Sequence, residues 1–182
     1  MNIINKIIFK RHKFSSLGKM KYVGKRIKVL APQYIKIGKN FTIGDNCYLQ
    51  TWPEYLGKKN NYIPELTIGD NVSMMSNCHI SCMNKVMIGN GCLLGDNVYI
   101  TDNFHGNNKL EEKDVIPIDR PLSSKGPVII GKNVWIGRNV CIMPGVIIGD
   151  NVIIGANSVV TSSVNSYTIV AGNPAKTIKD IE

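Results

Sequence analysis

One histidine lies at the base of a long loop, where side chains that do chemistry often lie. His105 falls in the segment Thr101-Asp102-Asn103-Phe104-His105-Gly106, and the glycine after it lets a ligand approach the backbone closely. A neutral imidazole within hydrogen-bond reach of a hydroxyl group can take its proton, and the ordinary histidine pKa is near neutral. His105 is therefore a candidate catalytic residue. Asp102 either orients this imidazole or forms the turn, and the residues leave both roles open.

The elements that must position His105 repeat every six residues. Between residues 130 and 164, an aliphatic residue begins each unit. These residues are Ile130, Ile136, Ile142, Ile148, Ile154 and Val160. The next residue is glycine in two units and another residue in the third, so the full period is eighteen residues. A helix repeats every 3.6 residues and a strand every 2, so units of six indicate a short strand and a corner. The sequence therefore predicts a triangular parallel β-helix.

The same period runs from Ile37 to Ile100 with interruptions, and it predicts about five coils in total. Extra residues follow Leu49, Ile80 and Ile100, each time after the third strand of a coil. These insertions must therefore project from one edge of the prism, one above another. The longest, the loop 102–128, has no apolar period and exceeds ordinary connections in length, which is typical of functional loops.

The two ends of the chain differ from the body. We assign residues 1–30 to a basic N-terminal cap segment and residues 31–182 to the β-helix domain. A short amphipathic helix is expected near the N-terminus, and a short closing element is expected after Gly172-Asn173-Pro174. Residues 1–26 carry eight Lys and Arg side chains and no acidic one. This segment either caps the open end of the solenoid, which such folds require, or contacts an anionic membrane surface.

Composition excludes several classes of protein. The chain has 182 residues, of which 43% are hydrophobic, but it has no apolar run of the roughly eighteen residues that a membrane span needs. The net charge of +9 belongs mostly to the N-terminal segment, so the body lacks the basic stripe that a nucleic-acid partner requires. The five cysteines are an odd number, which favours a reducing compartment. Cys47, Cys78 and Cys92 are expected to be small core residues. We expect a cytoplasmic protein, with an optional peripheral contact at the inner membrane face through residues 1–26.

Several stretches together resemble a known family. The hexads, the Asp-x-x-His at the loop base and the run from Gly126 to Gly137 are similar to those of the hexapeptide-repeat acyltransferases. The closing region, with Ile154-Gly155-Ala156-Asn157-Ser158 and Gly172-Asn173-Pro174, is similar as well. Over about residues 30–180, the chain resembles the maltose and galactoside O-acetyltransferase branch. Within this branch it most resembles the acetyltransferases of capsule, exopolysaccharide and lipopolysaccharide synthesis.

This resemblance implies an all-β fold, the left-handed parallel β-helix, which is an exception to the usual right-handed crossover. It also implies a homotrimer with active sites between neighbouring chains, acetyl-CoA as the donor, and no metal. The catalytic histidine of the family falls on His105, which the resemblance implies to be the general base. The acceptor would be the hydroxyl of a sugar or lipid-linked saccharide in surface polysaccharide biosynthesis, and it would attack the thioester directly.

The resemblance further maps a donor site onto a groove beside the catalytic histidine. Trp135 would border this groove or pack between subunits. Backbone around four residues would bind the pantetheine arm, and two lysines would meet the nucleotide phosphates or form a solvated C-terminal face. The residues are Arg138, Ala156, Thr161 and Ser162 for the arm, and Lys176 and Lys179 for the phosphates. On the acceptor side, Met75 and Met83 stand where galactoside enzymes have an asparagine and an aspartate. Asn77 and Asn84, which lie nearby, are the candidate acceptor contacts.

Three alternatives stay open. N-acetylation of an amino sugar would use nearly the same residues, because an amine needs the same deprotonation. A metal hydratase of the γ-carbonic anhydrase type would need three histidines around zinc, whereas the body offers only His105 and His79, which is expected on the surface. A non-catalytic β-helix would not need the long histidine loop. We therefore favour acyl transfer.

Overall fold

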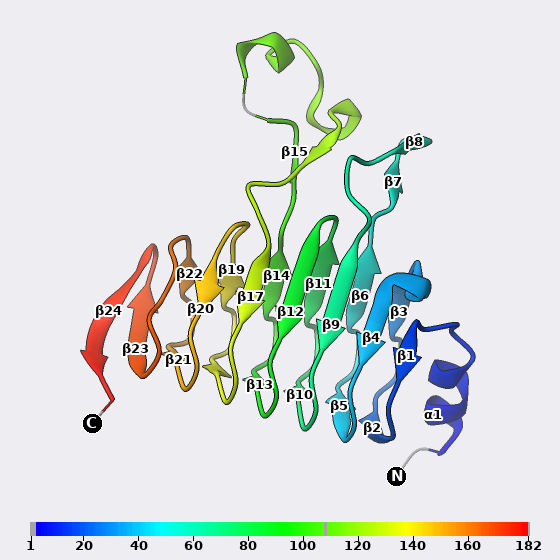
Figure 1. Cartoon of the computed structure of the whole chain (residues 1–182), viewed down its shortest axis with the longest axis vertical. Coiled ribbons are helices and arrows are strands. Elements are labelled where there is room, and N and C mark those ends of the chain that lie inside the picture. The colour runs from blue at the N-terminus through cyan, green and yellow to red at the C-terminus, as the bar shows by residue number, and fades with distance from the viewer. Residues whose placement is uncertain (1–2, 108, 182) are drawn as a thin grey trace.

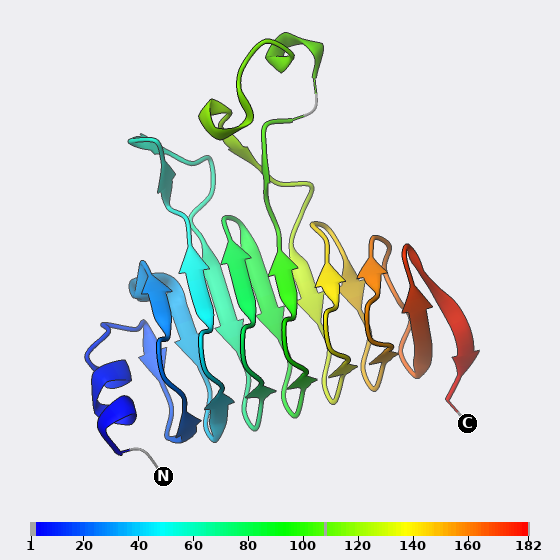
Figure 2. The same cartoon turned by 180° about the vertical axis from the view of Figure 1, so that it is seen from behind.

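The computed structural model of the chain describes residues 3–107 and 109–181. Its body is a parallel β-helix whose coils stack along one axis (Figures 1 and 2). Three sheets form the faces of a prism, and each complete coil contributes one strand to sheet A, one to sheet B and one to sheet C, in this order.

Sheet A contains β1 (Ser16–Leu17), β4 (Ile35–Ile37), β9 (Glu65–Ile68), β12 (Lys85–Ile88), β17 (Val128–Ile130) and β20 (Ile147–Ile148). Sheet B contains β2 (Met20–Val23), β5 (Phe41–Ile43), β10 (Ser73–Met74), β13 (Leu93–Leu94), β18 (Trp135–Ile136), β21 (Ile153–Ile154), β23 (Thr168–Gly172) and β24 (Ala175–Asp180). Sheet C contains β3 (Lys28–Leu30), β6 (Tyr48–Thr51), β11 (His79–Cys82), β14 (Tyr99–Thr101), β19 (Cys141–Ile142) and β22 (Val159–Val160).

The six-residue period originates in the core. The aliphatic residue that begins each unit points inward and is buried, as Ile88 and Ile130 are. The register aligns these two residues in neighbouring coils, so that inward side chains stack in columns along the axis. Removing one such side chain from water stabilises the fold by about 1.5–3 kcal/mol before the cost of ordering it. The repeat is therefore a packing repeat.

Tight corners explain the glycines and asparagines of the period. A Cβ atom at Gly131 would lie 2.4 Å from the Asp150 Oδ1 atom of the next coil, so a larger residue would push the coils apart. Many corners contain an asparagine with positive φ, a conformation that asparagine tolerates better than most residues. Their side chains stack along the corner. For example, Asn97 Nδ2 donates to Asn139 Oδ1 at 2.8 Å, and Asn139 Nδ2 donates to Asn157 Oδ1 at 2.9 Å.

The large insertions project from the edge between sheets C and A, as the spacing predicted (Figures 1 and 2). We call this edge the insertion edge. The first insertion, residues 52–64, contains the antiparallel hairpin of β7 (Glu54–Tyr55) and β8 (Lys58–Lys59). The second, residues 102–127, contains β15 (Phe104–His105), η2 (Leu110–Glu112), η3 (Pro117–Asp119) and β16 (Leu122–Ser123). A short 3-10 helix, η1 (Pro32–Tyr34), connects β3 to β4 at the same edge.

The β-helix begins one coil earlier than the period at Ile37 indicated. Strands β1, β2 and β3 form a coil within the segment that we assigned to the cap, and they pair in parallel with the coil after them. The signal was present in the sequence, because Leu17, Val23 and Val29 are six residues apart and glycine follows the first two. Lysines between them conceal this pattern, since the outward face of a strand tolerates charge.

Both ends of the solenoid are covered. Helix α1 (Ile3–Lys10) packs near β2, and Phe9 is buried in the core with its ring centroid 4.9 Å from that of Phe14. At the other end, β24 folds back antiparallel onto β23. Within the described part of the chain, no helix is both long and apolar enough to cross a bilayer.

Candidate active site

His105 is held on a two-stranded ribbon above the insertion edge. Strand β15 pairs antiparallel with β16, so that His105 lies opposite Leu122. The imidazole is exposed, and its ring centroid lies 5.3 Å from that of Tyr55 in an edge-on arrangement. Tyr55 belongs to the first insertion, and its hydroxyl donates to the Ile118 carbonyl in the second at 2.8 Å. The two insertions therefore define the surroundings of the imidazole together.

A cavity of about 290 Å³ adjoins the imidazole, and we call it the His105 cavity. Sheet C and both insertions supply its walls. Its lining residues are Gln50, Trp52, Tyr55, His79, Ser81, Tyr99, Asn103, Phe104, His105, Ile118 and Leu122. Small-molecule sites typically measure about 300–1,000 Å³ and combine aromatic walls with a few polar groups. This cavity is at the lower limit of that range and suits one small unit of a ligand.

Asp102 attaches the second insertion to the coil beside it. Its side chain is fully buried, with Oδ1 accepting the Met83 backbone N–H at 2.7 Å and Oδ2 accepting the Asn84 backbone N–H at 2.8 Å. Among the hydrogen bonds of the described residues, none links Asp102 to His105. The carboxylate thus fixes the loop base to the preceding coil, a role other than the two predicted from the sequence.

Asn103 extends this attachment toward the first insertion. Its Nδ2 donates to the Ser81 carbonyl at 3.2 Å, to Ser81 Oγ at 3.1 Å and to Asp102 Oδ1 at 3.0 Å. Trp52 Nε1 donates to the same Ser81 Oγ at 3.1 Å. Sequence reasoning missed Asn103, Trp52 and Tyr55. All three follow the third strand of a coil, which places them on the insertion edge. This position in the period could have indicated them as site residues.

His79 lines the same cavity, although we expected it on the surface. It lies in sheet C between Tyr48 and Tyr99, with ring centroids 5.2 and 5.3 Å away. Its Nε2 atom is 2.6 Å from Gln50 Oε1, so the neutral ring donates this hydrogen bond from Nε2. Burial lowers the pKa of His79 and favours this neutral form.

The two predicted acceptor contacts lie at different edges. Asn84 lies at the insertion edge, where its backbone N–H bonds to Asp102. Asn77 lies at the corner between sheets B and C with a φ of 60°, and its Oδ1 accepts from Asn46 Nδ2 at 3.0 Å. Within one chain, Asn84 therefore lies near the base of the histidine loop, whereas Asn77 lies at another corner of the prism.

The predicted donor residues are distributed over several parts of the prism. Trp135 is 54% exposed on sheet B, the face that the insertion edge does not border. Arg138, whose Nη2 lies 2.8 Å from Asp96 Oδ2, and Ala156 lie at the corner between sheets B and C. The remaining four are Thr161 and Ser162 on the insertion edge, two coils beyond β14, and Lys176 and Lys179 on β24. Trp135 and His105 of one chain therefore lie on different sides of the prism.

Four of the five cysteines are buried. Cys47, Cys78 and Cys92 are buried, as the sequence predicted, and Cys82 is buried too. Burial raises the pKa of Cys82 and Cys92, which disfavours the nucleophilic thiolate. Within residues 3–107 and 109–181, no three His, Cys, Asp or Glu side chains gather as a metal site would require.

Comparison with known proteins assigns the class. Residues 127–162 match the family model described as bacterial transferase hexapeptide (six repeats). The chain is 38% identical over 149 residues to WbbJ of Escherichia coli (strain K12), named as an inferred lipopolysaccharide biosynthesis O-acetyl transferase, with 80% of this chain and 71% of WbbJ covered. We therefore identify a hexapeptide-repeat transferase.

Solved structures agree with this fold. A maltose O-acetyltransferase from Clostridium difficile 630 is 28% identical with a TM-score of 0.61, covering 100% of this chain and 79% of that one. A mutant of the N-acyltransferase AntD from Bacillus cereus, solved with dTDP-4-amino-4,6-dideoxyglucose and coenzyme A, is 23% identical with a TM-score of 0.78, covering 97% of this chain and 89% of that one. The fold is the left-handed parallel β-helix, and the chain belongs to the hexapeptide-repeat family of acyltransferases.

Proposed function

We propose that this protein transfers an acetyl group from acetyl-CoA to a sugar hydroxyl in surface polysaccharide biosynthesis, with His105 as general base. The observation that carries the proposal is the exposed imidazole beside a cavity with aromatic and polar walls. The relative at 38% identity, whose name assigns O-acetyl transfer in lipopolysaccharide biosynthesis, supports the choice of acceptor class. A crystal structure of another relative in this fold, from Vibrio cholerae, holds acetyl-CoA, which supports the choice of donor.

The chemistry follows from the position of His105. The imidazole takes the proton of the sugar hydroxyl while the hydroxyl oxygen attacks the thioester carbonyl carbon. The carbon–sulfur bond then breaks, the coenzyme A thiolate leaves, and the imidazolium returns the proton to this sulfur. General-base assistance of this kind typically contributes about 10²–10⁴ in rate. Asp102 and Asn103 act as positioning residues, because they fix the loop that carries the imidazole.

The proposal includes a homotrimer with the site between chains. Trp135 lies on sheet B and His105 lies at the insertion edge, so both can border one site only if neighbouring chains supply them. Arg138 and Ala156 would reach the donor from the same neighbour. Lys176 and Lys179 would then meet the nucleotide phosphates as point charges.

The proposed location is the cytoplasm, where acetyl-CoA is made. The basic N-terminal segment would serve as a cap, because Phe9 is buried against the first coil. A peripheral contact of residues 1–26 with an anionic inner membrane face stays compatible with this role, since the charged side chains of Lys10, Arg11 and Lys13 lie toward solvent.

We expect His105→Ala to lower kcat by about 10²–10⁴ with little change in KM, because the variant loses the general base and keeps the cavity walls. The assay measures thiol release from acetyl-CoA with a panel of neutral sugars, amino sugars and lipid-linked saccharides. His12→Ala, which removes a histidine of the N-terminal segment, is the matched control and should keep full activity. Full activity of His105→Ala would refute the assignment, and a preference for amines over hydroxyls would change the reaction to N-acetylation.

A further inference from the structure

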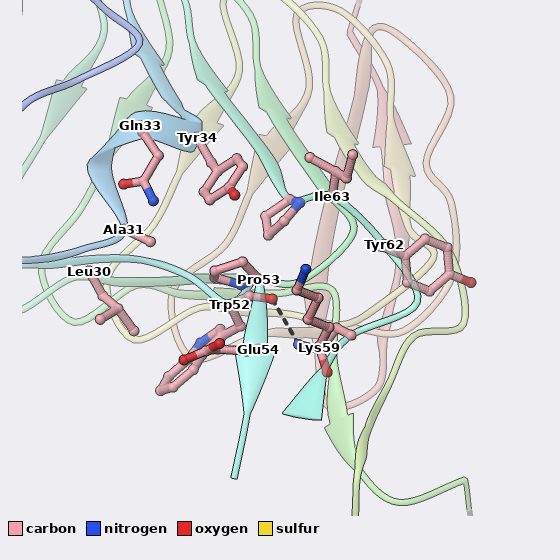
Figure 3. A pocket seen from close by; sticks show the side chains of 12 residues that line it. Leu30, Ala31, Gln33, Tyr34, Trp52, Pro53, Glu54, Lys59, Tyr62 and Ile63 are labelled. Carbon is pink, nitrogen blue, oxygen red and sulfur yellow. Dashed lines mark hydrogen bonds between the residues drawn. The ribbon is translucent and has the colours of Figure 1, made fainter. Parts of the chain in front are cut away.

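A second cavity at the insertion edge is larger than the His105 cavity, at about 840 Å³. We call it the outer cavity. The end of β3 and helix η1 form one wall, and the first insertion forms the other. Figure 3 shows Gln33 and Tyr34 on one side of this cavity and Trp52 and Glu54 on the other. Its volume is within the range of about 300–1,000 Å³ that is typical of ligand sites.

Trp52 lies between the outer cavity and the His105 cavity, because it lines both. Hydrogen bonds hold this residue at both its side chain and its backbone. Its Nε1 donates to Ser81 Oγ at 3.1 Å, and its carbonyl accepts from Asn60 Nδ2 at 2.8 Å. The two cavities are therefore neighbours across one fixed indole, so a ligand with one unit beside His105 would reach the outer cavity with its next unit by passing this side chain.

The lining of the outer cavity suits a sugar ring. Tyr34 and Trp52 offer flat apolar surfaces, against which the C–H face of a pyranose can pack. Among the described residues, the side chains of Gln33, Glu54 and Lys59 form no hydrogen bond or salt bridge with another residue. An amide can donate and accept, and a carboxylate accepts at two oxygens, so these groups can pair with adjacent hydroxyls of a sugar.

The charge of the lining distinguishes a neutral glycan from a sugar nucleotide. Lys59 is the basic side chain of the lining as far as the structure describes it, and Glu54 in the same hairpin carries the opposite charge. A diphosphate would instead require several Lys or Arg side chains converging on its oxygens. The outer cavity therefore favours an uncharged ligand with many hydroxyl groups.

We propose that the outer cavity binds a second, neutral sugar unit of the acceptor, so that the acceptor is at least a disaccharide. This inference depends on the proposed function, because it takes the first unit to lie beside His105. It narrows the substrate class from any sugar to a neutral oligosaccharide, or the end of a longer glycan.

The experiment measures binding to an array of neutral oligosaccharides of two to four units, with monosaccharides and sugar nucleotides on the same array. The full-length protein is used without acetyl-CoA, as wild type and as Gln33→Ala, Tyr34→Ala and Asn61→Ala. Gln33 is exposed, so its replacement should leave the fold unchanged. Asn61→Ala is the matched control, since it removes an exposed amide of the first insertion that does not line the cavity.

We expect an oligosaccharide to bind more tightly than any monosaccharide or sugar nucleotide. Gln33→Ala and Tyr34→Ala should each weaken this binding by about five- to tenfold, and Asn61→Ala should not. The array measures binding without acetyl transfer, whereas the thiol-release assay of His105→Ala measures transfer, so this inference and the proposed function can fail separately. The inference is overturned if no neutral oligosaccharide binds, if sugar nucleotides bind best, or if the two cavity variants bind as Asn61→Ala does.

Discussion

His105 contacts the ring of Tyr55, and its position depends on hydrogen bonds made at the base of its loop. Asp102 supplies two of them, to backbone N–H groups of Met83 and Asn84. Removing a buried acceptor leaves its donors unsatisfied, at a cost of about 1–3 kcal/mol for each. At the scale of residues, His105 is thus the proposed group for proton transfer, and Asp102 and Asn103 hold the loop that carries it.

His79 permits a prediction about pH. Burial lowers its pKa in the folded chain below the ordinary value of 6.5, so the unfolded chain takes up this proton first as the pH falls. Its contribution to stability is therefore complete above about pH 6.5 and decreases as the pH falls below that value. We expect the urea midpoint to drop between pH 7.5 and pH 5.5, and to drop less in His79→Gln. An equal drop in His79→Gln and in the wild type would contradict the prediction.

At the scale of elements, each coil is stable only against its neighbours. The inward columns and the corner ladders both join one coil to the next, so the terminal coils have one covered side and need a cap on the other. Helix α1 supplies this cap at the N-terminal end, where Phe9 enters the core. Because β1 and β2 are short and flanked by lysines, we infer that the first coil depends strongly on this residue.

Phe9→Ala should destabilise the first coil by about 3–5 kcal/mol, because it removes a large buried ring from a packed end. Hydrogen exchange should show faster exchange in β1 to β3, with little change in the coils beyond β12. Ile7→Ala is the matched control in the same helix, since Ile7 is 51% exposed. The N-terminal segment could instead bind a membrane and contribute nothing to the fold. In that case, Phe9→Ala will leave this exchange unchanged, and Ile7→Ala will weaken binding to anionic vesicles.

At the scale of the whole molecule, sheet B presents an apolar surface to its surroundings. Leu93 pairs with Trp135 and Trp135 pairs with Ile153, so their outward side chains form a row along the sheet. Leu93 and Trp135 are 39% and 54% exposed in the single chain. If a neighbouring chain covers this row, its own insertion edge can lie close to the row. The proposed trimer requires this arrangement, because it takes Trp135 from one chain and His105 from the next.

The molar mass in solution tests this arrangement. Light scattering should give about three times the chain mass of 20.1 kDa. Trp135→Glu should shift the protein toward smaller species without loss of β-structure, because it places a charge within an apolar contact. Tyr62→Glu changes an exposed aromatic residue of the first insertion, 42% exposed, and should keep the wild-type mass. A wild-type protein that is monomeric in solution would contradict the proposal that neighbouring chains share the active site.

The periodic sequence determined the inward residues, the corners and the edge of the large insertions, because each depends on contacts that recur every six residues. Ile130 is buried and the histidine loop leaves the insertion edge, as the period required. Which side chains meet there was decided only by the tertiary structure. The insertions have no period, so the approach of Tyr55 to His105 and the attachment of Asp102 to Met83 depend on contacts between distant segments. For the same reason, the sequence alone did not indicate that Trp52 lines two cavities.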